Sequence, residues 1–187
     1  MTIAKYRKLD LLIWTVVCII IDLIGYLASQ KELIFFYVTL STPVLLILYI
    51  RWGSWGLIPT AIVAILHTVL YRNFDFMPMV LYIFSIFGIA ASMIWFKIIR
   101  KNSIKEEVLW LILYFLTGYL AMFLIQALSQ FILFKEIEWF VLITRHGLNI
   151  ALGFVILMIA KRQEDLLVDM KTYLLKQIKE RQQEEHV

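Results

Sequence analysis

The chain has 187 residues, of which 62% are apolar and only 17% are charged, and its formal net charge is +4. Soluble domains are usually about 45–50% apolar and about 25% charged. This composition excludes a disordered chain and an ordinary soluble enzyme, the single cysteine excludes a disulfide scaffold, and a protein embedded in a lipid bilayer is predicted.

Six apolar runs, taken in chain order, are predicted to be membrane-spanning helices. Crossing about 30 Å of hydrocarbon takes roughly 20 mostly apolar residues. The predicted ranges are 10–29, 33–50, 54–71, 78–99, 107–134 and 138–160. Pro43 and Pro59 are predicted to kink or locally open the second and third helices. The predicted fold class is an all-α membrane protein, with a bundle of six transmembrane helices over residues 1–160.

The positions of lysine and arginine predict the orientation, because cytoplasmic loops carry an excess of these residues. With the N-terminus inside, three basic residues lie outside (Lys31, Arg72 and Lys135), and Arg145 is left within the last span. The other fourteen lie inside: Lys5, Arg7, Lys8, Arg51, Lys97, Arg100, Lys101, Lys105, Lys161, Arg162, Lys171, Lys176, Lys179 and Arg181. Six spans then place both termini in the cytoplasm of a multi-pass protein of the cell membrane.

Residues 161–187 form a separate, cytosolic tail in this prediction. Leu167, Met170, Leu174 and Ile178 recur at helical spacing among charged residues, which predicts an amphipathic helix. Two interpretations remain open. The tail is either a solvated continuation of the sixth helix, or a helix whose apolar face docks on a partner or lies on the membrane surface.

Polar residues within the predicted spans gather at one depth. Such residues are costly in a bilayer and usually face the bundle interior or a water-filled cavity. In the predicted orientation every helix carries its polar residues mainly in its outer half, which predicts a pocket open to the outside and closed below by apolar packing. The candidate binding residues at that level are Asp22, His67, Tyr82, Ser85, Gln126, Gln130, Arg145, His146 and Asn149.

Arg145 is the most informative of these residues. It lies some seven residues, or roughly 10 Å, inside the sixth span, too deep for its side chain to reach water comfortably, so it requires an anion. Asp22 is the only carboxylate at a similar depth. Arg145 therefore either forms a permanent bridge to Asp22 or binds a carboxylate or other anionic group of a ligand.

Motifs for catalysis and metal binding are missing from the sequence. There is no G-x-x-x-x-G-K-[ST], H-E-x-x-H or G-x-S-x-G motif, and no second embedded aspartate for an aspartyl dyad. His67 and His146, without a close third ligand, are interpreted as interior histidines rather than metal ligands. No enzyme activity, metal, cofactor or nucleic-acid partner is predicted, and any active transport must draw its energy from a partner protein.

Two segments resemble the S components of energy-coupling factor (ECF) transporters, which are also six-helix proteins without an ATPase of their own. The first is Ser41-Thr42-Pro43-Val44-Leu45-Leu46, running into Arg51-Trp52-Gly53. The second is the tail Arg162-Gln163-Glu164-Asp165-Leu166-Leu167, continuing through Lys171-Thr172-Tyr173-Leu174-Leu175. The likeness in architecture covers nearly the whole chain, and the two segments cover about a fifth of it.

This resemblance implies a substrate-binding subunit in a prokaryotic plasma membrane. It would capture a vitamin or related micronutrient outside the cell, and a transmembrane coupling protein with two cytosolic ATPases would drive it to topple and release the ligand inside. Such proteins bind substrate mainly through helices four to six, which carry Tyr82, Ser85, Gln126, Gln130, Arg145, His146 and Asn149. Many members dock the coupling protein through Ala-x-x-x-Ala on the first helix, and no such pair occurs here, so that docking surface is unassigned. The alternative function is a membrane sensor or scaffold that signals through the 161–187 helix.

Overall fold

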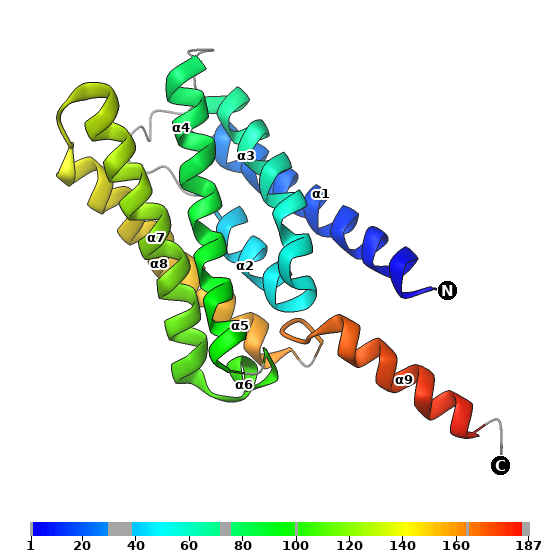
Figure 1. The fold of residues 1–187 in the computed structure, drawn as a ribbon. Coiled ribbons are helices and arrows are strands. Elements are labelled where there is room, and N and C mark those ends of the chain that lie inside the picture. Colours follow the sequence, from blue (N-terminus) through cyan, green and yellow to red (C-terminus); the bar gives the residue numbers. More distant parts are fainter. Residues whose placement is uncertain (1, 30–38, 72–75, 100, 164, 185–187) are drawn as a thin grey trace.

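The structure, a computed structural model, describes residues 2–29, 39–71, 76–99, 101–163 and 165–184. These residues form helices and no strand, as predicted for an all-α protein (Figure 1). In chain order the elements are α1 (Ile3–Ser29), α2 (Ser41–Trp52), the 3-10 turn η1 (Gly53–Gly56), α3 (Leu57–Tyr71), α4 (Phe76–Phe87), the 3-10 segment η2 (Gly88–Ile94), α5 (Trp95–Ile98), α6 (Lys101–Glu106), α7 (Val108–Phe134), α8 (Trp139–Arg162) and α9 (Met170–Glu184).

Among the described residues, five helical runs are long and apolar enough to cross a membrane. They are Ile3–Leu27, Ser41–Leu70, Met79–Ile98, Val108–Phe134 and Trp139–Arg162. Their outward faces carry large exposed apolar side chains, for example Leu12 and Ile24 on α1 and Leu120 on α7. Contiguous apolar surface of this extent is unfavourable in water and favourable in lipid. The chain is a multi-pass membrane protein.

The run Ser41–Leu70 is two antiparallel helices rather than one. Gly53 adopts φ 61°, a backbone conformation that strongly favours glycine, and η1 then reverses the chain direction. Thr42 of α2 and His67 of α3 line the same pocket, although one straight helix would hold those positions roughly 37 Å apart. This reversal accounts for the separate second and third helices of the prediction. The first part of the predicted second span, residues 33–38, lies outside the described residues.

The predicted effect of the prolines is wrong. Pro43 and Pro59 each occupy the third position of their helix, α2 and α3. Helix α2 follows two non-helical residues, so the backbone N–H groups of its first turn have no intrahelical partner and Pro43 removes no hydrogen bond there. Both helices continue past their prolines to Trp52 and Tyr71.

Helix α2 is the core of the bundle (Figure 1). All 12 of its residues are buried, and its side chains pack against α1, α3, α7 and α8. Its sequence, apolar on every side from Val44 to Ile50, is typical of a helix that is enclosed by other helices. The first turn of α2 therefore reaches the predicted polar level, and its last turn reaches the opposite end of the bundle.

Arg51, in the last turn of α2, joins three parts of the chain at that opposite end. Its Nε and Nη2 each donate to a different carboxylate oxygen of Asp10 on α1, at 3.0 Å. Its Nη1 donates to the backbone oxygen of Asp165 at 2.6 Å. The indole nitrogen of Trp52 donates to Asp10 at 2.6 Å. We call Asp10, Arg51, Trp52 and the Asp165 carbonyl the basic-end cluster.

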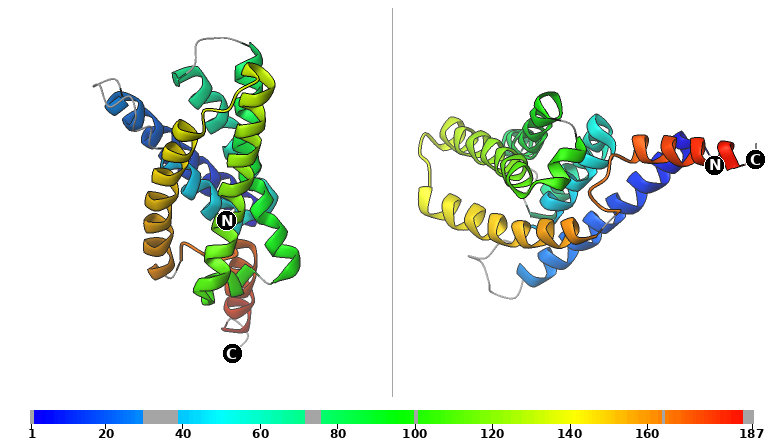
Figure 2. Two further views of the ribbon diagram at one scale, coloured as in Figure 1. Left: turned by 90° about the vertical axis from the view of Figure 1, so that its left-hand side faces the viewer. Right: turned by 90° about the horizontal axis from the view of Figure 1, so that it is seen from below.

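The tail differs from an unbroken continuation of the sixth helix. Helix α8 ends at Arg162, and Gln163 adopts an extended conformation before α9 begins at Met170. Leu167 and Met170 are buried in the hydrophobic core, so these two residues face the bundle itself. Helix α9 then extends beyond the bundle, beside the first turn of α1 (Figure 2).

Close contact between η2 and α7 depends on Gly88. A Cβ atom on Gly88 would lie 2.9 Å from the backbone N and Cα of Met122. Small residues at helix contacts allow such close approach in membrane proteins. This contact brings the α4–η2 segment, which carries Tyr82 and Ser85, against α7, which carries Gln126.

Gly88→Ala is expected to lower the free energy of unfolding by about 1–3 kcal/mol, because the added methyl group meets backbone that must move. Gly147→Ala is the matched control, since a Cβ atom there has nothing within 4 Å. Thermal unfolding of the two purified variants in the same detergent provides the measurement. Equal melting temperatures would contradict the close packing of η2 on α7.

Candidate functional site

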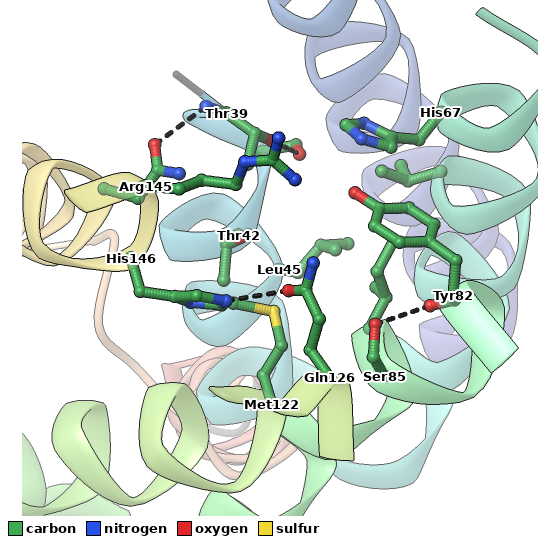
Figure 3. Close-up of a pocket in the computed structure, with 14 residues that line it drawn as sticks. Thr39, Thr42, Leu45, His67, Tyr82, Ser85, Met122, Gln126, Arg145 and His146 are labelled. Carbon is green, nitrogen blue, oxygen red and sulfur yellow. Dashed lines mark hydrogen bonds between the residues drawn. The ribbon is translucent and has the colours of Figure 1, made fainter. Parts of the chain in front are cut away.

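The polar residues predicted at one depth meet in a pocket between five helices. It is enclosed by the first turn of α2 and by α3, α4, α7 and α8 (Figure 3). Of the predicted binding residues, His67, Tyr82, Ser85, Gln126, Arg145, His146 and Asn149 line this pocket. Asp22 lies behind its wall, in contact with Thr39 and His67. Gln130 lines a neighbouring cavity.

Thr39 connects Asp22 on α1 to Asn149 on α8. Its backbone N–H donates to Asn149 Oδ1 at 2.9 Å, and its hydroxyl donates to Asp22 Oδ1 at 3.1 Å. The same hydroxyl lies 2.7 Å from Ser41 Oγ, the first residue of α2. These bonds hold the start of α2 in place at the pocket.

Asp22 contacts His67 of α3 in the part of the chain that the structure describes, and the two predicted roles of Arg145, a bridge to Asp22 or a contact to an anionic ligand, stay predictions. His67 Nδ1 lies 3.6 Å from Asp22 Oδ2, and both side chains are almost fully buried. The imidazole also stacks on the ring of Tyr82, with centroids 5.0 Å apart and planes inclined by 16°. One face of the pocket is therefore formed by His67 and Tyr82, and Asp22 lies behind His67.

The Asp22–His67 contact is expected to give a coupling free energy of about 0.5–3 kcal/mol in a double-mutant cycle of Asp22→Asn and His67→Gln. Lys176 and Glu180 form an exposed pair at 3.7 Å and serve as the control cycle, for which at most about 0.5 kcal/mol is expected. Chemical unfolding of the four proteins in each cycle measures both values. A coupling free energy at Asp22–His67 no larger than in the control cycle would contradict a stabilising contact between these two side chains.

His146 and Gln126 close the opposite side of the pocket. His146 Nε2 and Gln126 Oε1 are 2.7 Å apart, so the ring nitrogen is the donor. The imidazole meets the ring of Phe123 edge-on, with centroids 5.3 Å apart. His146 Nδ1 is buried and has no hydrogen-bond partner among the described residues. A buried polar atom in this state is uncommon in folded proteins.

Two features of the pocket can attract an anion, although the buried carboxylate of Asp22 lies close behind its wall. Arg145 lines it, and its side chain points toward Thr39 and the start of α2 (Figure 3). The first turn of α2, with Ser41 and Thr42, also lines the pocket and has no side-chain cap at its N-terminus. Backbone N–H groups at a helix N-terminus carry partial positive charge and attract anions.

Gln130 lies about one helical turn beyond Gln126 and lines a second cavity of similar size, about 40 Å³. This cavity shares Tyr82, Ser85 and Gln126 with the pocket, and Ser85 Oγ donates to the backbone oxygen of Tyr82 at 2.7 Å. Gln130 Oε1 is buried with no hydrogen-bond partner in the described part of the chain. The two cavities are therefore neighbouring parts of one polar region.

The pocket is small in this conformation. Its volume is about 30 Å³, room for about two water molecules. Sites for drug-sized ligands are roughly 300–1,000 Å³. The polar side chains are thus packed on one another, and a ligand the size of a vitamin requires them to separate.

Several lining residues were missing from the predicted site. Thr39, Ser41 and Thr42 belong to the same polar level, and that depth pattern was the signal that would have included them. Leu45, Val63, Ile86 and Met122 form apolar parts of the lining. No sequence signal distinguishes these four from the many other apolar residues of the bundle.

No protein-family model, curated protein or solved structure matches the chain. The candidate site is therefore identified from the structure alone, by where its polar residues lie in the bundle. Polar side chains from α1, α2, α3, α4, α7 and α8 meet at one level, while the lipid-facing sides of α1 and α7 at that level are apolar.

Proposed function

We propose that the chain is a membrane-embedded substrate-capture subunit of the ECF type. It binds a small micronutrient with an anionic group in a pocket that opens to the outside of a prokaryotic cell. A separate transmembrane coupling protein and two cytosolic ATPases supply the energy for import. The chain itself binds its substrate and carries out no reaction.

The observation that carries this proposal is the convergence of the polar residues on one pocket. Polar residues from separate helices, selected only by their depth in the predicted spans, line a single space that Arg145 and the first turn of α2 make favourable for an anion. Below it, Leu45, Val63 and Ile86 provide an apolar floor. A channel would need polar groups through the full depth of the membrane. Polar groups at one level above an apolar floor instead favour binding of a substrate from one side of the membrane.

Purification of the tagged chain from its native membrane tests this function. We expect recovery of a transmembrane coupling protein with two ATPases, and release of one small anionic compound on denaturation, identified by mass spectrometry. Consistent absence of all three proteins from gently solubilised preparations would contradict a role in ECF-type import.

The second candidate function is a membrane sensor or scaffold, and the exposed apolar side chains of α9 favour it. Tyr173, Leu175 and Ile178 are between 36% and 43% exposed, on a helix that extends beyond the bundle. A cytosolic partner recovered with the chain, in place of ATPases, would favour this function. Its binding would then be lost when α9 is removed.

A further inference from the structure

A groove lies between the start of α1 and α9, beside the basic-end cluster. Its volume is about 170 Å³, and it is lined by Thr2, Ile3 and Tyr6 on one side and by Leu174, Gln177, Ile178 and Arg181 of α9 on the other. The four α9 residues are spaced i, i+3, i+4 and i+7, so one face of α9 is turned toward α1. Ile178 is still 40% exposed, so the chain itself does not fill the groove.

The groove lies where a membrane span begins. Ile3 is the first residue of the apolar run Ile3–Leu27. Tyr6, Leu9 and Ile13 are spaced i, i+3 and i+7 and therefore share one face of α1, and Leu9 and Ile13 are 48% and 52% exposed. The α1 side of the groove thus continues directly into an apolar, lipid-facing stripe. A lipid whose acyl chain lies along this stripe has its head group at the level of the groove.

The charge beside the groove is positive. Arg181 lines it and has no ion-pair partner within the described part of the chain, and the same holds for Lys5 and Lys8 on α1. Helix α9 carries four basic residues and two acidic ones. Three carboxylates at this end of the bundle are already paired, as Asp10–Arg51, Lys101–Asp169 and Lys176–Glu180. An anionic group from outside the chain complements this surface.

We propose that the α1–α9 groove binds an anionic phospholipid of the adjoining leaflet. Its phosphate-bearing head group lies at Arg181, and one acyl chain follows Leu9 and Ile13 along α1. Basic side chains next to a membrane span attract anionic lipids, and an apolar helix face adds to that attraction at the membrane surface. A cytosolic protein could use the charge of α9 but would make no use of the lipid-facing stripe. The proposal is independent of the proposed import function.

Native mass spectrometry of the purified full chain tests this proposal. The protein in detergent is titrated with phosphatidylglycerol, or with phosphatidylcholine that has the same acyl chains. We expect a phosphatidylglycerol molecule to bind at a concentration at least fivefold lower than phosphatidylcholine. Equal binding of the two lipids would overturn the proposal.

Two charge variants locate the head group. Arg181→Gln is expected to weaken phosphatidylglycerol binding about fivefold, the usual contribution of one basic side chain at an anionic lipid surface. Lys179→Gln is the matched control, because Lys179 is an exposed basic residue of the same helix that does not line the groove. It is expected to change the affinity less than twofold. Equal losses would indicate a diffuse attraction to α9 and would overturn a site in the groove.

Two apolar variants test the groove itself. Ile178→Ser is expected to weaken phosphatidylglycerol binding at least threefold, whereas Leu175→Ser, at a similarly exposed position outside the groove, is expected to leave it unchanged. Both side chains are exposed, so both variants should remain folded, which thermal unfolding checks. Equal binding by the two folded variants would contradict a lipid in the groove.

Hydrogen exchange in nanodiscs gives a measurement that needs no variant. Residues 170–184 are expected to exchange more slowly in nanodiscs of phosphatidylglycerol than in nanodiscs of phosphatidylcholine. Equal exchange in the two lipids would overturn the proposal and leave the exposed side chains of α9 to a protein partner. None of these results depends on recovery of a coupling protein or ATPase, so the proposal and the import function can fail separately.

Discussion

Replacing Arg145 with glutamine is expected to weaken ligand binding roughly 10- to 100-fold while the protein remains folded. Hydrogen bonds to a charged group contribute about 1.5–3 kcal/mol, and Arg145 is the charged side chain that lines the pocket. Glutamine keeps the ability to donate hydrogen bonds and removes only the charge. The measurement is the amount of the co-purifying small molecule that each protein retains, determined by mass spectrometry after gel filtration.

Arg162→Gln is the matched control, because it makes the same substitution in the last turn of the same helix, far from the pocket. It is expected to retain as much ligand as the wild-type protein. Equal retention by Arg145→Gln and Arg162→Gln, with both proteins folded, would contradict a role for the Arg145 charge in binding.

Arg51→Met is expected to lower the free energy of unfolding by about 3–5 kcal/mol, because it leaves the carboxylate of Asp10 partly buried without its cation. The side chains of Arg51 and Asp10 are only 6% and 12% exposed. The change also removes the hydrogen bond to the Asp165 backbone oxygen. Hydrogen exchange in residues 165–170 should therefore rise together with the loss of stability. Thermal unfolding and hydrogen-exchange mass spectrometry measure the two effects.

Arg7→Met provides the comparison for this second expected effect. The Arg7 guanidinium lies 3.8 Å from the ring centroid of Trp55 at the same end of the bundle. A cation–π contact at such a site contributes about 0.5–1 kcal/mol. The double variant Asp10→Asn with Arg51→Met should recover part of the loss, since no unpaired charge then remains in the basic-end cluster. A loss in Arg51→Met no larger than in Arg7→Met would show that this cluster contributes little to stability.

Much of the helix layout could be predicted because a bilayer imposes simple length and polarity requirements. The predicted fifth and sixth spans, 107–134 and 138–160, agree closely with α7 (Val108–Phe134) and α8 (Trp139–Arg162). The local structure around Pro43 could not be predicted so simply. The effect of a proline depends on its distance from the helix start, and apolar sequence alone does not locate that start within one turn.

The depth of the polar residues in the sequence predicted most of the residues that line the pocket. It did not predict which of these residues contact one another. Depth specifies the level of a residue, and the partner at that level depends on how each helix is rotated and packed. The contact of Asp22 with His67 on α3, for example, could not be predicted from depth alone.

The enclosure of α2 has a consequence for how the protein responds to bilayer thickness. A helix of 12 residues is roughly 18 Å long, well short of the hydrocarbon thickness of about 30 Å. A lipid-facing helix of that length would suffer hydrophobic mismatch, but α2 is surrounded by protein, and its ends meet polar side chains rather than lipid. Thinner or thicker membranes therefore act on the lipid-facing helices such as α1 and α7. The spacing between the pocket and the basic-end cluster is fixed by α2 and is insulated from the lipid.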